Sequence, residues 1–322
     1  MTDQELQENT QTVRDRAISK LERDIGEAMS LALNDPKTVE VMLNADGVLW
    51  QERMGEPMRS IGRLRASQGE SIIKTVAGYH GKVITRQNPV LEGEWPLDGS
   101  RFAGQLPPIV QAPVFAIRKK AIAIFTLAQY VEAGIMTQQQ MDVIVEAVTN
   151  HRNILIIGGT GSGKTTLVNA VISEMVKSFP CERYCIIEDT GEIQCAAENY
   201  VQYHTSLDVS ITALLKVILR MRPDRIFVGE VRGGEALDLL DAWNTGHPGG
   251  AATLHANSAA EGLTRMKSLV SRNSAAPTEI EPLIGEVVHV VVHIARTAQG
   301  RRVQEILEIS GYRDGRYITR VL

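Results

Sequence analysis

Residues 158–165 read Gly-Gly-Thr-Gly-Ser-Gly-Lys-Thr, a glycine-rich stretch that ends in a lysine and a hydroxyl residue. Glycines let several backbone N–H groups turn toward one anion, and the N-terminus of a following helix adds partial positive charge. At this spacing we expect Lys164 to reach the β- and γ-phosphates of ATP and the Thr165 hydroxyl to bind Mg²⁺. The expected nucleotide-binding residues are Gly158, Gly159, Thr160, Gly161, Ser162, Gly163, Lys164, Thr165 and Thr166.

The context of this loop favours phosphate binding over a glycine turn that binds nothing. Ile154–Ile157 is a short apolar run, typical of a strand that is buried on both faces. From Thr165 onward, apolar residues return at helical spacing. A strand that leads through a glycine loop into a helix is the arrangement that the motif needs.

Two acidic segments follow predicted strands further along the chain. One is Glu188–Glu192 and the other is Gly229-Glu230. Ligands of a parallel sheet lie beyond the carboxyl ends of its strands, so both segments are expected to face the loop. We expect Glu230 to orient or deprotonate the attacking water and Glu188 to coordinate Mg²⁺ or water. Either glutamate could be the base, and exposed strand-end carboxylates without a role are the alternative.

A histidine-containing segment comes after the acidic ones. It includes Thr245-Gly246-His247 and, after the apolar run Ala251–Leu254, His255. At a strand end, His255 is placed to hydrogen-bond a phosphate oxygen or Glu230, and so to report the nucleotide state. We expect a structural role and no metal cluster for the remaining histidines, which are His80, His151, His204, His289 and His293.

The elements that must position these residues fall into two parts. Residues 1–125 predict a small α+β domain, with an amphipathic helix over 13–34, a hairpin at 39–52, and strands that include Lys82–Thr85 and Val114–Ile117. Residues 126–137 are interpreted as a linker. Residues 138–322 predict an α/β domain in which strands and helices alternate around a mostly parallel sheet.

The strands of the second part can be assigned in two groups. The parallel group includes Tyr184–Ile187, Ile226–Val228 and Ala251–Leu254. Antiparallel strands are expected to be added at the end, at Val287–Ile294, Val303–Ile309 and Tyr317–Val321.

Composition limits the possible functions. The 322 residues carry a net charge of −4 without a basic tail, so direct, tight nucleic-acid binding is not expected. The three cysteines are too few for a disulfide framework and read as reduced thiols. We find no apolar signal segment and no stretch of about 20 apolar residues that would span a bilayer. These features predict a soluble, cytoplasmic protein.

With these motifs in order, the chain resembles the traffic ATPases of type II and type IV secretion systems. The segments that carry the resemblance are 158–165, Glu188–Glu192, Gly229–Arg232 and Thr245–Asn257. Residues 229–247 and 41–47 look like the conjugal transfer, or TrbB-type, branch. The absence of a four-cysteine zinc insert also argues for the conjugation and type IV branch.

The resemblance implies a PAS-like N-terminal domain followed by a RecA-like P-loop domain. It implies a hexameric ring of identical subunits that hydrolyses ATP to power conjugative transfer or type IV secretion. Inner-membrane components of the channel are the implied partners, with peripheral membrane association through them. It also implies that Arg101 and Arg118 are presented to the nucleotide from the N-terminal domain, and that Glu230, Glu188, His255 and His247 belong to the catalytic segments.

Other functions remain as alternatives. A nucleotide-gated assembly scaffold would bind ATP with little turnover, but it would not need Glu188, Glu230 and the histidine segment. A DNA-pumping RecA-like motor fits poorly with the even charge distribution and the lack of a stacking platform. A pilus-retraction motor shares the same catalytic core.

Overall fold

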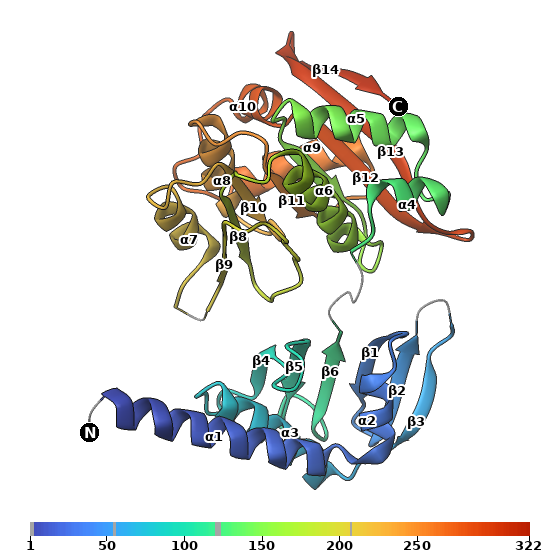
Figure 1. Ribbon diagram of the computed structural model, residues 1–322, viewed down its shortest axis with the longest axis vertical. Helices are drawn as coiled ribbons and strands as arrows, with labels where there is room; N and C mark the ends of the chain where they lie inside the picture. Colours follow the sequence, from blue (N-terminus) through green and yellow to red (C-terminus); the bar gives the residue numbers. More distant parts are fainter. Residues whose placement is uncertain (1–2, 54–55, 120–123, 207) are drawn as a thin grey trace. The chain divides into compact units, whose positions relative to one another are not determined.

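The computed structural model describes the chain apart from residues 1–2, 54–55, 120–123 and 207, and the side chains of 1–11 and 13 are not described (Figure 1). The chain divides into two compact units, residues 1–122 and 123–322. This division falls close to the boundary expected after residue 125. Each unit has a sheet of its own.

The N-terminal unit is an antiparallel sheet with helices along one side (Figure 1). Its strands lie in the order β3-β2-β1-β6-β5-β4. The elements are α1 (Asp3–Asp24), α2 (Gly26–Asn34), β1 (Thr38–Leu43), β2 (Val48–Arg53), β3 (Arg59–Arg63), α3 (Ala66–Tyr79), β4 (Val90–Glu94), β5 (Arg101–Gln105) and β6 (Val114–Arg118). Apolar side chains of α1–α3 and of the sheet form one core, in which Phe102 stacks on Trp95 and Phe115.

Two expectations for this unit are wrong. The single helix expected over 13–34 is two helices, because Gly26 has a φ of 69° and breaks the first one. Lys82–Thr85 is not a strand. The N–H of Thr85 donates to the carbonyl of Asn88, and the Thr85 hydroxyl accepts from the N–H of Asn88, so the chain turns back on itself there. The hairpin of β1 and β2 and the strand β6 are confirmed.

The C-terminal unit is a mostly parallel sheet in the order β14-β13-β12-β7-β11-β10-β8-β9. Pairs from β12 to β9 are parallel, and β13 and β14 are antiparallel. Its elements are α4 (Leu127–Glu132), α5 (Gln138–Thr149), β7 (Ile154–Ile157), α6 (Lys164–Ser178), β8 (Tyr184–Glu188), β9 (Tyr200–His204), α7 (Ile211–Ile218), β10 (Arg225–Val228), α8 (Glu235–Asn244), β11 (Ala251–Leu254), α9 (Ala259–Val270), α10 (Ile280–Val287), β12 (Val290–Thr297), β13 (Gly300–Arg313) and β14 (Arg316–Val321).

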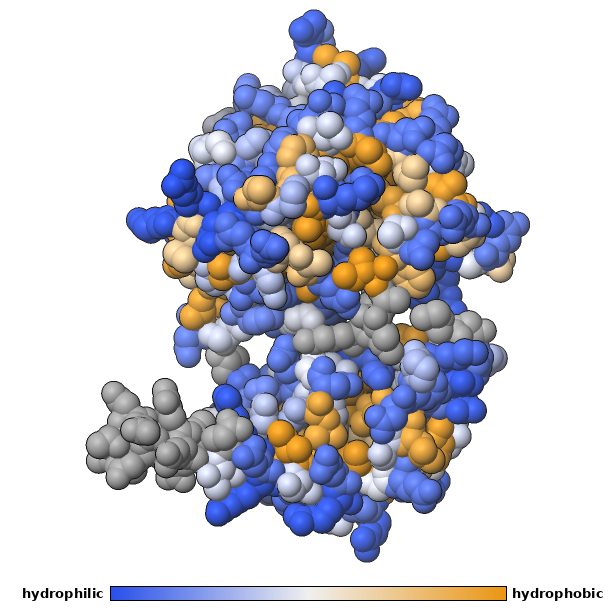
Figure 2. Space-filling model, viewed as in Figure 1, coloured by the Kyte–Doolittle hydropathy of each residue, from blue (hydrophilic) through white to orange (hydrophobic). Residues whose placement is uncertain are grey.

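Both faces of this sheet are buried, as the unbroken apolar strands predict. Leu155 and Ile157 of β7 pack into the core under α7–α10, and their neighbours Ile154 and Ile156 pack into the core under α4–α6. Successive strand residues point to opposite faces, so helices must cover both. The visible surface of the molecule is mostly hydrophilic, with smaller hydrophobic patches (Figure 2).

Three features of this unit differ from the sequence-based expectations. β12 was expected to be antiparallel, and it is antiparallel to β13. Its other neighbour is β7, to which it is parallel, because α9 and α10 carry the chain across one face of the sheet first. β9 was not anticipated. Within the residues 126–137 that were interpreted as a linker, Leu127 and Tyr130 of α4 are buried in the core of the C-terminal unit.

Gly250, just before β11, has no room for a side chain. A Cβ there would lie 2.1 Å from the carbonyl oxygen of Ile226 and 2.3 Å from Nε1 of Trp243, which donates a hydrogen bond to that oxygen. We expect Gly250→Ala to lower the free energy of unfolding by about 1–3 kcal/mol, as overpacking does. Denaturant unfolding measures this. Gly78→Ala, in α3 with open space around it, is the control, and equal stability of both variants would contradict the packing argument.

Candidate nucleotide-binding site

The glycine-rich loop joins β7 to α6 and is shaped by close packing. Gly161 and Gly163 have φ values of 69° and 101°, a conformation that side chains disfavour. A Cβ on Gly158 would lie 2.2 Å from the carbonyl oxygen of Ile294 in β12. These glycines allow the tight path of the loop, and α6 begins at Lys164, as the motif predicts.

Lys164 is held at the loop by three acceptors. It is only 8% exposed, and its Nζ donates to the carbonyl oxygens of Gly158 at 2.9 Å and Gly159 at 3.0 Å. The third contact is Nδ1 of His255, at 3.3 Å. Thr160 is exposed, and Thr165 and Thr166 are half-buried in the first turn of α6. The loop thus presents one cation and the hydroxyl of Thr165 at the same helix N-terminus.

His255 connects this lysine to Glu230. Its Nε2 lies 3.0 Å from Oε1 of Glu230, while its Nδ1 faces Lys164. Glu230 also accepts a hydrogen bond from Arg232 at 2.7 Å, and Arg232 donates to Asp189 at 2.6 Å. A continuous chain of charged and polar groups therefore runs from the phosphate loop across the carboxyl ends of β11, β10 and β8.

Burial and neighbouring charges set the protonation states of Glu230 and His255. Burial favours the neutral form of Glu230, but Arg232, His255 and Lys164 outweigh it and hold the pKa of the carboxyl below its usual range. Burial lowers the pKa of His255, and the charge of Lys164 lowers it further. At neutral pH, a neutral His255 accepts from Lys164 at Nδ1 and donates from Nε2 to an ionised Glu230.

Glu188 is buried and hydrogen-bonded within the protein. It is 4% exposed, and its Oε2 accepts hydrogen bonds from the N–H groups of Glu192 at 2.8 Å and Ile193 at 3.0 Å. Gln202 of β9 donates to its other oxygen. Burial raises the pKa of Glu188 to about 7, even though these hydrogen bonds favour the ionised form. One oxygen of Glu188 thus holds the loop that follows β8, and the other contacts β9.

Glu192, rather than Glu188, lies beside the loop threonine. Its Oε2 is 3.4 Å from Oγ1 of Thr165. Asn169, one turn further along α6 and 1% exposed, accepts from the N–H of Gln194 at 3.0 Å and donates to the carbonyl of Glu192 at 3.3 Å. Sequence reasoning missed Asn169, although its spacing of four from Thr165 places both on one helix face.

Gly229 carries the backbone of Glu230 close to the neighbouring strands. Its N–H donates to the carbonyl of Ile187 at 2.8 Å, and its own carbonyl accepts from the hydroxyl of Thr253 at 2.6 Å. A Cβ on Gly229 would lie 2.9 Å from that of Glu188. The glycine before Glu230 is therefore required by space, and Thr253, a second residue that sequence reasoning missed, fixes this turn.

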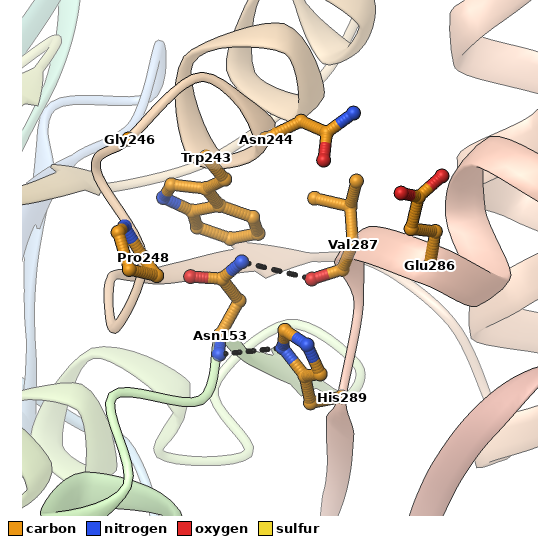
Figure 3. A pocket seen from close by; sticks show the side chains of 8 residues that line it. All are labelled: Asn153, Trp243, Asn244, Gly246, Pro248, Glu286, Val287 and His289. Carbon is orange, nitrogen blue, oxygen red and sulfur yellow. Dashed lines mark hydrogen bonds between the residues drawn. The ribbon is translucent and has the colours of Figure 1, made fainter.

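His247 lies at the amino-terminal ends of the parallel strands, opposite the ends that carry the phosphate loop and His255. It precedes β11, whereas His255 follows it, and its Nδ1 lies 2.9 Å from the carbonyl oxygen of Pro223, which precedes β10. Its neighbours Gly246 and Pro248 line a pocket of about 320 Å³ with Trp243, Asn153 and His289 (Figure 3). Within this unit, His247 is thus separated from the phosphate loop by the length of β11.

Arg101 and Arg118 belong to the N-terminal unit and lie directly opposite each other on β5 and β6. Glu40 of β1 is the cross-strand partner of Arg118 on its other side. Burial raises the pKa of Glu40, although the charges of Arg118 and Arg101 act against this. Both residues are half-buried, and as direct cross-strand partners they lie on one face of this sheet.

The sheet order, the glycine-rich loop and the acidic strand ends define a RecA-like P-loop nucleotide-binding domain, which follows a smaller α+β domain in the sequence. Residues 100–312 match the model of the family described as "Type II/IV secretion system protein". The chain belongs to this family, whose members are P-loop ATPases.

Individual relatives agree with this assignment. "Probable conjugal transfer protein TrbB" of Sinorhizobium fredii is 47% identical over 302 residues, which cover 94% of this chain and 92% of the relative. The VirB11 ATPase from the Brucella suis type IV secretion system, solved in complex with sulphate, is 27% identical, with a TM-score of 0.50 and coverage of 92% and 96%. The Legionella pneumophila ATPase DotB, at 22% identity, a TM-score of 0.58 and coverage of 91% and 80%, shares the fold.

No helix in the described ranges is long and apolar enough to cross a membrane. In the same part of the chain, no group of three or more histidine, cysteine, aspartate or glutamate side chains is arranged to hold a metal ion.

Acidification is expected to lower the free energy of unfolding through His289, which lies at the amino-terminal ends of the parallel strands. Its Nδ1 accepts a hydrogen bond from the N–H of Asn153 at 3.0 Å, and burial and then Arg152 lower its pKa below 6.5 (Figure 3). The unfolded chain binds a proton at His289 more readily than the folded protein does. The contribution of His289 to the free energy of unfolding is therefore fully present above pH 6.5 and is lost as the pH falls through the lower pKa of the folded state.

His289→Asn keeps an acceptor but removes the titration. We expect its free energy of unfolding to fall less than that of the wild type between pH 8 and pH 5.5, measured by denaturant unfolding. His204→Asn, an exposed histidine of β9, serves as the control. The same pH dependence in His289→Asn and the wild type would contradict the argument.

Proposed function

We propose that this protein hydrolyses ATP with Mg²⁺ at residues 158–165 and uses the cycle to drive conjugative transfer or type IV secretion. The relative that is 47% identical carries a conjugal transfer name, and the VirB11 structure comes from a type IV secretion system. The proposed working form is a ring of six identical subunits. It acts in the cytoplasm, at the inner membrane, through components of the secretion channel, and without tight nucleic-acid binding.

The series of side-chain contacts from Lys164 through His255 to Glu230 is the observation that carries this proposal. Phosphate oxygens attract the Lys164 ammonium more strongly than backbone carbonyls do, because they are charged. When Lys164 turns to the β- and γ-phosphates, Nδ1 of His255 loses its donor, and protonation of the ring there would let His255 donate to a γ-phosphate oxygen. Glu230 is ionised and lies beside it, so it is the group that orients or deprotonates the attacking water.

The residues around Thr165 suit a magnesium ion that is bound mainly by phosphates and water. Mg²⁺ keeps several waters and uses one or two protein oxygens at such sites, and it neutralises charge on the β- and γ-phosphates. We propose that the Thr165 hydroxyl binds it and that Glu192 binds one of its waters. Glu188 then acts one step further away, by holding the backbone of Glu192.

The arginine pair of the N-terminal unit completes the proposal. Phosphoryl transfer usually needs an added cation against the charge of the transition state. Arg101 and Arg118 lie side by side and are half-buried, and we assign them this role. His247 lies before β11, away from the phosphate loop. We propose that it acts on contacts between subunits of the hexamer or on the position of β11, rather than on the phosphates of its own subunit.

Replacement of the two central residues is expected to stop turnover in different ways. Lys164→Ala removes the cation that meets the phosphates and should weaken nucleotide binding. Glu230→Gln should keep binding but slow steady-state phosphate release by about 10²–10⁴-fold, the usual contribution of a general base. Glu261→Gln, an exposed carboxylate of α9, is the control. Retained turnover in Glu230→Gln would contradict its assignment as the base.

The two remaining glutamates can be separated by their magnesium dependence. We expect Glu192→Gln to raise the Mg²⁺ concentration needed for half-maximal phosphate release, because one carboxylate near the ion is lost. Glu188→Gln should instead lower protein stability, since it disturbs a buried site with three donors. A raised Mg²⁺ requirement for Glu188→Gln alone would return the metal role to Glu188.

The scaffold alternative predicts a different outcome. A nucleotide-gated scaffold would bind ATP and form the ring with negligible phosphate release. Mass measurement with and without ATP, together with phosphate release from the same wild-type sample, separates the two functions.

A further inference from the structure

The β12–β13 hairpin flanks the phosphate loop on the side away from His255. β12 is parallel to β7, so its carboxyl end lies at the same edge of the sheet as the loop. The hairpin turns at residues 298–299, where Thr297 and Gly300 are cross-strand partners and the Thr297 hydroxyl donates to the carbonyl of Gly300 at 2.9 Å. The chain thus returns along the loop as the first residues of β13.

Arg301, the second residue of β13, lies against the phosphate loop. Its Nε donates to the carbonyl oxygen of Gly161 at 3.2 Å. A Cβ on Gly163 would lie 3.0 Å from Cδ of Arg301, so the arginine stem passes directly over this glycine. Arg301 thus meets the loop through both its polar Nε and its apolar stem.

The rest of the hairpin holds Arg301 in place. Arg302, which points to the other face, donates to the carbonyl of Gly134, and the N–H of Val303 donates to the carbonyl of Ile135 at 2.8 Å. Arg301 therefore extends from an element that is fixed to the turn between α4 and α5. Arg296 lies directly opposite on β12 and places a second guanidinium on the same face, an arrangement that is unfavourable unless negative charge lies nearby.

We propose that Arg301 is a positioning residue for nucleotide binding, which holds the Gly161 peptide from outside so that the loop N–H groups point at the phosphates. In a phosphate-binding loop the N–H groups converge on the anion, and the carbonyl groups therefore face outward. The N–H of that peptide belongs to Ser162 and donates to the carbonyl of Gly159 at 3.3 Å. A cation on the Gly161 carbonyl polarises the peptide and strengthens this N–H as a donor that a phosphate oxygen can take over from Gly159. This inference rests on the proposed nucleotide binding at residues 158–165.

The position of Arg301 also explains why a second cation is useful. Lys164 contacts the carbonyl groups of Gly158 and Gly159, and these contacts are given up when its ammonium turns to a phosphate. Arg301 contacts a different carbonyl and does not take part in that exchange. It can keep the loop in its binding shape throughout the cycle.

The test compares Arg301→Met with Arg301→Lys in the full chain. Methionine keeps an apolar stem over Gly163 but removes the donor and the charge, whereas lysine keeps a charge. We expect Arg301→Met to raise the Kd for a fluorescent ADP analogue about tenfold, as loss of a charged hydrogen bond does. Phosphate release at saturating ATP should change little, and Arg301→Lys should restore much of the affinity.

A matched control lies at the far end of the same strand. Arg313 of β13 is also an exposed arginine opposite another arginine, Arg316, but it lies roughly 40 Å along the strand from Arg301. Arg313→Met should leave the Kd unchanged. Hydrogen exchange of amides 159–163, measured without nucleotide, should become faster in Arg301→Met alone.

The outcomes distinguish this inference from the proposed function. Nucleotide binding by the wild type with an unchanged Kd in Arg301→Met would overturn the role of Arg301 and leave the proposed function standing. A wild type that does not bind the ADP analogue would overturn both. An equal rise in Kd for Arg313→Met would show a general effect of charge, and would also overturn the positioning role.

Discussion

The contact between the Lys164 ammonium and its own loop is the interaction on which the site depends. A nearly buried cation needs close acceptors, because removing its charge from water is costly. Here the acceptors are two loop carbonyls and the ring of His255. Under the proposed function, phosphate oxygens compete for the same ammonium, so nucleotide binding would change the contacts of His255 and Glu230. One side chain would then join binding to catalysis.

The order of the strands makes this arrangement possible. β7, β11, β10 and β8 are neighbours in the sheet, and each delivers one part of the chain of contacts at its carboxyl end: Lys164, His255, Glu230 and Asp189. Parallel neighbours lie about 4.8 Å apart, which is close enough for side chains at adjacent strand ends to meet. On the other side of β7, the β12–β13 hairpin brings Arg301 to the outer face of the loop.

Local signals were sufficient to predict the phosphate loop and the buried strands around it, because a fixed spacing and an unbroken apolar run are visible in the sequence. The roles of Glu188 and Glu192 could not be separated in this way. They share one short acidic loop, and only the backbone path decides which carboxylate is buried and which lies beside Thr165. The parallel direction of β12 and the contact of Arg301 with Gly161 depend on helices and turns far away in sequence, which carry no local pattern.

A structure of the full chain with Mg²⁺ and a non-hydrolysable ATP analogue tests the central claim most directly. The account predicts that Lys164 Nζ leaves the carbonyl groups of Gly158 and Gly159 and contacts the β- and γ-phosphates. It also predicts that His255 and Glu230 face the γ-phosphate. A bound analogue with Lys164 still on its own loop carbonyls, or a nucleotide bound elsewhere in the protein, would contradict it.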